Sequence, residues 1–202
     1  GIEAMTSFGN IYRNNLVIGG DWWGNSLLSK GGSRSFQAYN NVIIQKPGGW
    51  LGLILGGAPP AQWAYAPGGE TTACYNCVAY NNVIINEAGS NALSLGSMGA
   101  HNSAVYNNIV INGKLTQLDD TRNMIFKNNI VSCGGGAALG SGFSWNYTGS
   151  LTLDYNNFFN CSGLPFQTHA IVGDPKFVAA DNWHINSGSS AVGTGTPVSF
   201  LG

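Results

Sequence analysis

The chain has 202 residues, of which 8% are charged, and its formal net charge is −1. This length suits a single domain with a sizeable core. The near-neutral charge argues against partners that are held by bulk charge, such as nucleic acid, an acidic membrane surface or a polyanion, and favours a neutral polymer. The sequence shows no signal peptide and no apolar run long enough to cross a membrane.

An internal repeat organises the chain. Six Asn-Asn pairs recur at spacings of 26, 41, 26, 21 and 28 residues. Each pair follows a short β-like segment and precedes apolar, mostly β-branched or aromatic residues, which indicates strands and not helices. The copies are IYRNNLVI (Asn14, Asn15), QAYNNVII (Asn40, Asn41), VAYNNVII (Asn81, Asn82), AVYNNIVI (Asn107, Asn108), IFKNNIVS (Asn128, Asn129) and LDYNNFFN (Asn156, Asn157). A repeat of this length predicts a solenoid with one pair per coil.

The Asn pairs also predict a ladder of side chains. Asn tolerates the left-handed backbone conformation and bonds neighbouring backbone groups, so one Asn per coil can stack on its copies about 4.8 Å apart. The two positions after each pair should alternate between the core and the outer face. They are Leu16/Val17, Val42/Ile43, Val83/Ile84, Ile109/Val110, Ile130/Val131 and Phe158/Phe159. We expect the outer row to be covered by the long loop, a neighbouring domain or, preferably, the C-terminal tail.

Three further boundaries follow from composition. Residues 1–202 read as one domain, and we expect it to be a module of a larger protein because the repeat begins within about a dozen residues of Gly1. Residues 56–76 are rich in Gly, Pro and polar residues and predict a lateral loop. Residues 162–202 follow the last pair and predict a covering and closing segment.

The repeat resembles the right-handed parallel β-helix, or pectate-lyase-like, superfamily. The segment GDPKFVAADNWHINSGSSAVGTG (173–195) is similar to the closing segment common in bacterial β-helix proteins. The resemblance implies an all-β, right-handed parallel β-helix of about six or more turns with an Asn ladder. It also implies a secreted or cell-surface location.

The four cysteines leave two alternatives open. Cys133 and Cys161 each follow the second Asn of their pair by four residues and should stack on neighbouring coils. A disulfide there is geometrically allowed, and a buried, reduced cysteine ladder is equally compatible. Cys74 and Cys77 form a CxxC motif without a second CxxC or a His pair, which argues against zinc.

One lateral face should carry the chemistry, because the segments before the Asn turns vary between copies. Within it, SLLSKGGSR resembles the segment around the catalytic lysine of the alginate and chondroitinase B lyase family, and Lys30 matches that lysine. In that family an arginine follows one turn later, but here Ile54 occupies its place. The resemblance around Lys30 nevertheless gives an alternative function, a polysaccharide lyase or a related enzyme acting on a uronate-containing polymer.

Two adjacent carboxylates give a second enzymatic alternative. A glycoside hydrolase needs two carboxyl groups across the scissile bond, and Asp119 and Asp120 are the tight acidic pair on this face, with His101 one turn earlier. Neighbouring strand residues point to opposite faces, which argues against an acid–base pair. The same aspartates could instead cap a turn or bind a sugar hydroxyl. In the lyase alternative one of them could hold a calcium ion; otherwise we expect no cofactor.

Tryptophans supply the preferred interpretation. Flat aromatic faces bury the apolar surface of a sugar ring while nearby polar groups bond its hydroxyls. We predict a non-catalytic carbohydrate-binding module, similar to the β-helix modules beside xylanases, that recognises xylan or a β-glucan of plant cell walls and is attached to a catalytic domain. The expected binding residues are Trp22, Trp23, Lys30, Trp50, Trp63, Tyr65, Asp119, Asp120 and Trp145. Trp183 is expected to be structural.

Overall fold

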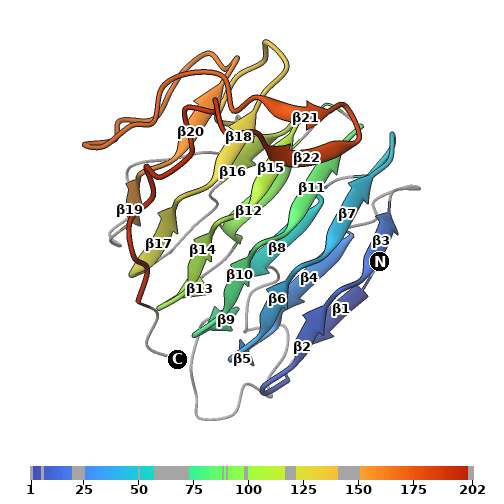
Figure 1. Cartoon of the computed structure of the whole chain (residues 1–202). Helices are drawn as coiled ribbons and strands as arrows, with labels where there is room; N and C mark the ends of the chain where they lie inside the picture. Colours follow the sequence, from blue (N-terminus) through green and yellow to red (C-terminus); the bar gives the residue numbers. More distant parts are fainter. Residues whose placement is uncertain are drawn as a thin grey trace.

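The computed structural model is a stack of coils built from short parallel strands (Figure 1). It describes residues 2–5, 7–19, 26–49, 51–56, 73–87, 89, 91–97, 100–116, 122–140 and 151–199. Outside a hairpin in the C-terminal tail, strands that follow one another along the chain lie in different sheets, and they pair with their counterparts on neighbouring coils. This arrangement confirms the predicted parallel β-helix. Among the described residues, no helix has the length and apolar character needed to span a membrane.

Three parallel sheets form the sides of the solenoid. Sheet 1 contains, in spatial order, β1 (Ile2–Met5), β4 (Leu27–Lys30), β8 (Leu53–Gly56), β12 (Asn91–Ser97) and β16 (Lys114–Thr116). Sheet 2 contains β2 (Ile11–Arg13), β6 (Gln37–Tyr39), β10 (Val78–Tyr80), β14 (Ala104–Tyr106), β17 (Met124–Lys127) and β19 (Leu151–Asp154). Sheet 3 contains β3 (Leu16–Gly19), β7 (Val42–Gln45), β11 (Val83–Asn86), β15 (Ile109–Ile111), β18 (Ile130–Ser132) and β20 (Asn157–Phe159).

Two smaller sheets complete the described strands. A narrow parallel sheet lies between sheets 1 and 2 in chain order and contains β5 (Ser33–Arg34), β9 (Cys74–Tyr75) and β13 (Ala100–His101). The tail carries an antiparallel hairpin of β21 (Phe177–Ala179) and β22 (Asn182–Ile185). Of the predicted lateral loop, Gly56 belongs to β8 and Cys74–Tyr75 to β9, whereas residues 57–72 lie outside the described part of the chain.

The Asn pairs occupy the corner between sheets 2 and 3, and the two residues of each pair have different structural roles. The first Asn takes the left-handed conformation, with φ between 53° and 57° at Asn14, Asn40, Asn81, Asn107 and Asn128. The second Asn forms the predicted ladder, in which Nδ2 donates to Oδ1 of the next coil at 2.9–3.1 Å along Asn15, Asn41, Asn82, Asn108, Asn129 and Asn156. The backbone nitrogen of each rung donates to the same acceptor.

The second amide hydrogen of each inner rung is also used. It donates to a backbone carbonyl of the preceding coil, for example from Asn82 to Ala38 O and from Asn129 to Val105 O. The inner rungs are about 1% exposed or less, so their amides are satisfied by the protein and not by water. The ladder confirms the predicted role of the repeat.

The sixth coil corrects the predicted alignment by one residue. Its ladder residue is the first Asn of the pair, Asn156, while Tyr155 takes the left-handed position with φ 55°. Asn157 consequently pairs in register with Ile130, and Phe158 pairs with Val131. The outer and inner positions of this coil are therefore Asn157 and Phe158, not Phe158 and Phe159. The reason is that stacking of the amide, not the position within the NN phrase, fixes the register.

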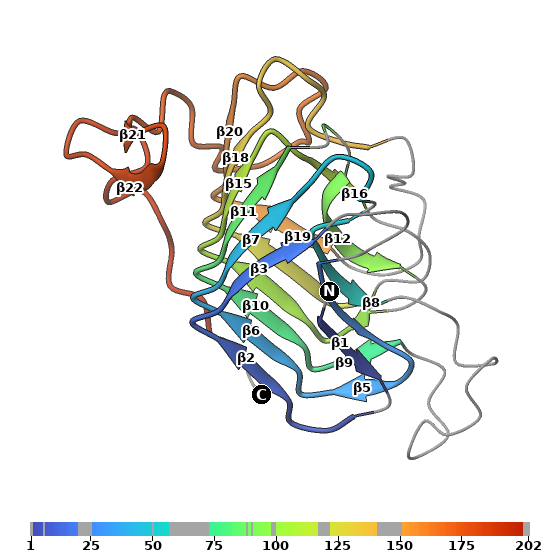
Figure 2. The same ribbon diagram turned by 90° about the vertical axis from the view of Figure 1, so that its right-hand side faces the viewer.

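Figure 2 shows the three sheets around the axis of the solenoid. The buried side chains of the core lie between these sheets. Its sheet 3 wall is the predicted inward row, in which Ile43, Ile84, Val110 and Val131 are fully buried. Small residues face them from sheet 2, where Ala38, Ala79 and Val105 are also fully buried, until Phe126 fills the fifth coil. Burial of these side chains at about 25 cal/mol per Å² supplies the main stabilisation of the coil stack.

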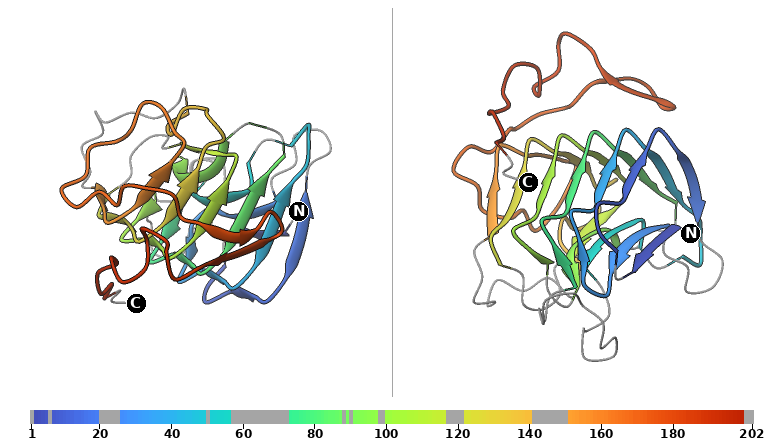
Figure 3. Two further views of the ribbon diagram at one scale, coloured as in Figure 1. Left: turned by 45° about the horizontal axis from the view of Figure 1, so that its top comes forward. Right: turned by 90° about the horizontal axis from the view of Figure 1, so that it is seen from below.

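The C-terminal tail lies against the outside of sheet 3. Figure 3 shows the tail, which contains the β21–β22 hairpin, passing over the outer side of the coils. Ile171, Trp183 and Ile185 of the tail line one cavity together with Ile109 and Ile130 of the outer row. Ile130 is only 8% exposed, but Leu16, the same position on the first coil, is 64% exposed. The tail therefore lies beside the outer row at the later coils of the solenoid.

Two disulfides link the four cysteines. Cys133–Cys161 joins neighbouring coils with a Cα–Cα distance of 4.9 Å, which resolves the two alternatives in favour of the disulfide. Cys74–Cys77 closes the CxxC motif, so these thiols do not form half of a zinc site. Cys74 and Cys77 are both buried in the core.

Candidate functional site

Most of the predicted binding residues fall outside the described part of the chain. Of the nine, the structure describes Lys30. The other eight lie outside the described residues; they are Trp22, Trp23, Trp50, Trp63, Tyr65, Asp119, Asp120 and Trp145. Their predicted contacts with a polysaccharide, and the calcium site considered for the aspartates, stay predictions. Within the described chain, no group of three or more His, Cys, Asp and Glu side chains is placed to hold a metal ion.

Lys30 forms an ion pair with Glu3 on the neighbouring coil. The two side chains project from β4 and β1, which pair in parallel register. Ile54, at the place of the family arginine, is 4% exposed and packs in a buried apolar cluster with Leu28 and Leu51. An ion-paired lysine beside an apolar cluster gives no support for proton abstraction, which requires a base together with positive charge or a metal at the carboxylate. We therefore base no proposed activity on Lys30.

A row of stacked tyrosines lies on the outer face of sheet 2. Tyr39, Tyr80 and Tyr106 end β6, β10 and β14 and pair in register. The ring centroids are 4.7 Å apart for Tyr39–Tyr80 and 5.1 Å apart for Tyr80–Tyr106, with interplanar angles of 11° and 2°. Because the rings lie face to face, the stack covers both faces of Tyr80 and one face each of Tyr39 and Tyr106.

Basic residues flank this tyrosine row at both ends. Arg13 pairs in register with Tyr39 and donates to its hydroxyl oxygen at 3.4 Å. Lys127 occupies the next register position after Tyr106. Desolvation by burial, and then the neighbouring phenol, raise the pKa of Tyr80 and of Tyr106 above the usual value. The hydroxyls of Tyr80 and Tyr106 therefore remain protonated donors across the physiological range.

Exposed amides run beside the tyrosines. Asn40, Asn81 and Asn107 directly follow the three tyrosines and are exposed to solvent. Their left-handed backbone turns the chain away from sheet 2 and holds each amide at the corner of the solenoid. We call these six residues the tyrosine–asparagine strip: Tyr39, Asn40, Tyr80, Asn81, Tyr106 and Asn107. The strip offers alternating hydroxyl and amide groups with a repeat set by the coil spacing of about 4.8 Å.

A cleft adjoins the strip at its Asn107 end. It has a volume of about 340 Å³ and lies between the outer row of sheet 3 and the tail. Asn107 lines it together with Ile109, Ile130 and, from the tail, Trp183 and His184. Trp183 packs edge-on against Phe177 at 5.7 Å, which fixes its ring within the hairpin. The volume and the mixture of apolar walls with a few polar groups are typical of small-ligand sites.

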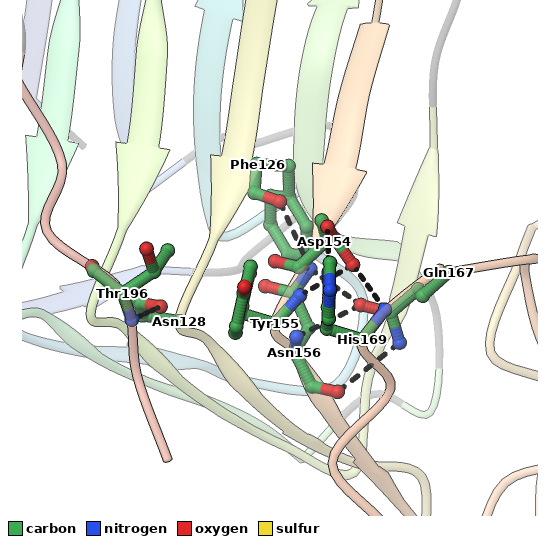
Figure 4. Close-up of polar contacts among 8 residues, drawn as sticks. All are labelled: Phe126, Asn128, Asp154, Tyr155, Asn156, Gln167, His169 and Thr196. Atoms are coloured by element: carbon green, nitrogen blue, oxygen red, sulfur yellow. Dashed lines mark hydrogen bonds and ion pairs between the residues drawn. The ribbon is translucent and has the colours of Figure 1, made fainter. Parts of the chain in front are cut away.

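Two sets of polar contacts hold the tail beside the cleft (Figure 4). Asn128 donates from Nδ2 to Thr196 O at 2.7 Å and accepts from Thr196 N at 3.0 Å. The backbone N–H of His169 donates a hydrogen bond to Asp154 Oδ1 at 2.7 Å, and His169 Nδ1 lies 2.8 Å from Asp154 Oδ2. The imidazole also stacks on Tyr155, with ring centroids 4.5 Å apart.

The charge state of Asp154 follows from these contacts. Desolvation by burial acts to raise its pKa, but the hydrogen bonds from the side chain and backbone of His169 and from Tyr155 N outweigh burial, and the pKa is lowered. Asp154 therefore stays ionised and anchors the tail.

The strip was not among the predicted binding residues, although its signal is present in the repeat. Tyrosine directly precedes the Asn pair in QAYNNVII, VAYNNVII and AVYNNIVI. Their recurrence at one position of adjacent coils predicts a stack on one face, and the alternation with the buried Ala38, Ala79 and Val105 places that stack outside. The cleft had no comparable signal, because it depends on where the tail returns.

Comparisons with known proteins add no family. No protein-family model matches the chain, and the searches of curated proteins and of solved structures gave no match.

Proposed function

We propose that this protein is a non-catalytic carbohydrate-binding module that holds a neutral plant cell-wall polysaccharide, xylan or a β-glucan, along the lateral surface of the solenoid. The observation that carries the proposal is the tyrosine–asparagine strip, in which Tyr80 and Asn81 form the middle rung. Hydroxyl and amide groups are donors and acceptors at once, so they match the hydroxyls of a neutral sugar chain. A regular spacing of such groups along one line suits a linear polymer.

Charge and compartment support the same proposal. Only 8% of the residues are charged, so the surface does not select a polyanion by bulk charge. Cys133–Cys161 and Cys74–Cys77 are both oxidised, and disulfides persist in oxidising compartments such as the cell exterior. A secreted or cell-surface module attached to a catalytic domain fits these features.

The strip binds mainly by hydrogen bonds, because the tyrosine faces inside the stack cover one another. Each hydrogen bond contributes about 0.5–1.5 kcal/mol net, and a polymer gains by contacting several rungs together. The predicted tryptophans would add stacking contacts to this set, and Trp183 in the adjoining cleft offers a further apolar wall for a sugar ring.

Native affinity electrophoresis through gels that contain xylan, β-glucan, alginate or pectin tests the proposal. Xylan or β-glucan should retard the protein without clearing of the gel. Tyr80→Ala should weaken retardation by roughly tenfold, corresponding to about 1.4 kcal/mol, because it removes a hydroxyl and both stacking contacts. Tyr80→Phe keeps the stack and should weaken binding less.

A matched control and an opposite outcome complete the test. Tyr75→Ala removes a half-buried tyrosine of β9, outside the strip, and should bind as the wild type does. Absence of retardation by every neutral polymer would overturn the binding module. Cleared zones in alginate or pectin that disappear in Lys30→Ala would establish the lyase alternative instead.

A further inference from the structure

The tail ends the tyrosine–asparagine strip at the fifth coil. Lys127 stands there in place of a tyrosine. The amide of Asn128, at the position that Asn107 has one coil earlier, is bonded in both directions to Thr196 (Figure 4). Gly195 lies against the same amide, since a Cβ at residue 195 would stand only 3.3 Å from Asn128 Oδ1. A polymer on the strip therefore meets the tail directly after the fourth coil.

The cleft begins where the strip ends. Asn107 belongs to both, because it carries the last amide of the strip and also lines the cleft. It is exposed, and within the described chain its amide has no hydrogen-bond partner. An unused amide therefore stands at the point where a chain would pass from the strip into the cleft.

The far side of the cleft is closed by the tail itself. The two tail segments that lead into and out of the β21–β22 hairpin both reach β20, where Asn157 donates from Nδ2 to Gly173 O at 3.1 Å and to Ser190 Oγ at 3.0 Å. Asn157 is fully buried. Ile171 and Ala191 belong to the same two segments and line the cleft. The cleft thus lies between the strip on the fourth coil and tail residues at the sixth, an arrangement that lets a chain enter but not pass through.

The two long walls of the cleft are apolar. Ile109 and Ile130 pair in register on the sheet 3 side. Trp183 and Ile185 belong to β22, and strand alternation places both on one face of the hairpin. A space of about 340 Å³ remains between the walls. Apolar walls that do not touch lack packing contacts, which a ligand with an apolar face would supply.

The polar groups of the cleft favour a neutral ligand. Among the described residues that line it, none is Asp, Glu, Lys or Arg, so a charged ligand would find no ion-pair partner there. A sugar ring offers C–H surface to Trp183 and hydroxyls to Asn107. The volume lies near the lower limit for ligand sites, which suits the end of one chain.

We propose that the module recognises the end of a polysaccharide chain. The terminal sugar residue enters the cleft and stacks on Trp183, and the residues behind it lie along the strip from Asn107 toward Tyr39. This end recognition rests on the proposed function, because it takes the polymer to be bound on the strip. It adds a selectivity: an internal segment would have to bend away from the solenoid at the tail and would lose the contacts inside the cleft.

Isothermal titration calorimetry of the intact 202-residue chain tests the proposal with xylohexaose and long soluble xylan, or with the β-glucan hexasaccharide and polymer. The wild type should bind one protein molecule per chain in both cases, because chain length does not change the number of ends. Trp183→Ala should lower the affinity for the hexasaccharide roughly tenfold, because it removes one wall of the cleft. Val178→Ala is the matched control: it changes a residue of the same hairpin that is 55% exposed, and it should bind as the wild type does.

Two results would overturn end recognition: several protein molecules on each long chain, or an unchanged affinity of a folded Trp183→Ala variant. Weaker binding by Tyr80→Ala would in either case leave the proposed function standing. If the wild type binds no neutral saccharide, the proposed function fails and end recognition fails with it. If Trp183→Ala does not fold, Ala191→Leu gives the same test, because added bulk in the cleft should lower the hexasaccharide affinity roughly tenfold, and an unchanged affinity would again overturn the proposal.

Discussion

Gln167 closes the asparagine ladder on Asn156. Its Oε1 accepts hydrogen bonds from the Asn156 backbone nitrogen at 2.8 Å and from Nδ2 at 2.9 Å, and its Nε2 donates to Asn156 O at 3.1 Å. A glutamine from the tail thus takes the place of a seventh rung. The same contact fixes the start of the tail beside β19 and β20.

Replacement of Gln167 by Ala should destabilise the fold by about 1–3 kcal/mol. Asn156 is fully buried, so removal of the acceptor leaves its backbone nitrogen unsatisfied, whereas Nδ2 keeps Phe126 O and Asp154 O. A buried orphan group has a cost of that order. Urea unfolding measures the change. Thr168→Ala, at the exposed neighbouring residue, should change stability by less than about 0.5 kcal/mol. Equal effects of the two changes would show that the ladder needs no such cap.

The two members of one Asn pair should respond differently to substitution. Asn108→Ala removes the acceptor for the backbone and side-chain donors of the buried Asn82, and we expect a loss of about 3 kcal/mol or more. Asn107→Gly keeps the left-handed turn, with φ 55°, at a position that glycine adopts without strain, and should be nearly neutral. Thermal unfolding of both variants checks the order, and a larger loss for Asn107→Gly would contradict the ladder.

Acid should loosen the tail by way of Asp154. Its pKa is lowered in the folded state. The stabilisation it provides is therefore complete above the pKa of the unfolded chain, about 3.9, and is lost as the pH falls through the lower folded value. Urea midpoints of the wild type should decline from about pH 5 to pH 3 more steeply than those of Asp154→Asn. Asp181→Asn, at an exposed position, should keep the wild-type slope; if Asp154→Asn keeps it too, the pair does not anchor the tail.

The two disulfides should differ in their contribution to stability. Cys133–Cys161 closes a segment with a sequence separation of 28, and Cys74–Cys77 one of 3. In the chain-entropy account the longer loop contributes roughly 3.5 kcal/mol and the shorter one roughly 2 kcal/mol. Paired Cys→Ala variants, unfolded in urea, measure both, and the larger loss is expected for Cys133→Ala/Cys161→Ala. The reverse order would indicate that packing around Cys74 outweighs loop closure.

The repeat alone was sufficient for the fold. An apolar phrase around Asn-Asn, recurring six times, identifies strands, corner turns and a stacked amide, because each depends on local backbone preference and on contact between identical neighbours. The one error in alignment came at Asn156, where Tyr155 replaces the first Asn. Alignment of the repeats by sequence alone cannot show that the ladder position in the sixth coil is taken by the first Asn of the pair and not by the second.

The candidate site was predicted less completely. Lys30 was singled out by likeness to a lyase segment, but its ion pair with Glu3 depends on how two coils register. The eight other predicted residues stay predictions. Tyr39, Tyr80 and Tyr106 stand in the printed repeat, yet their role follows only from the face on which their strand places them.

The sequence by itself determined the coil: which residues form strands, which turn the corner and which amide stacks, since all of these are set by short-range chemistry repeated along the chain. The tertiary structure alone decided where the tail returns, and with it the Gln167 cap, the anchor at Asp154 and the cleft beside Asn107 and Trp183. The physical reason is that these contacts involve tail residues that lie outside the repeat, so a periodic pattern could not predict them.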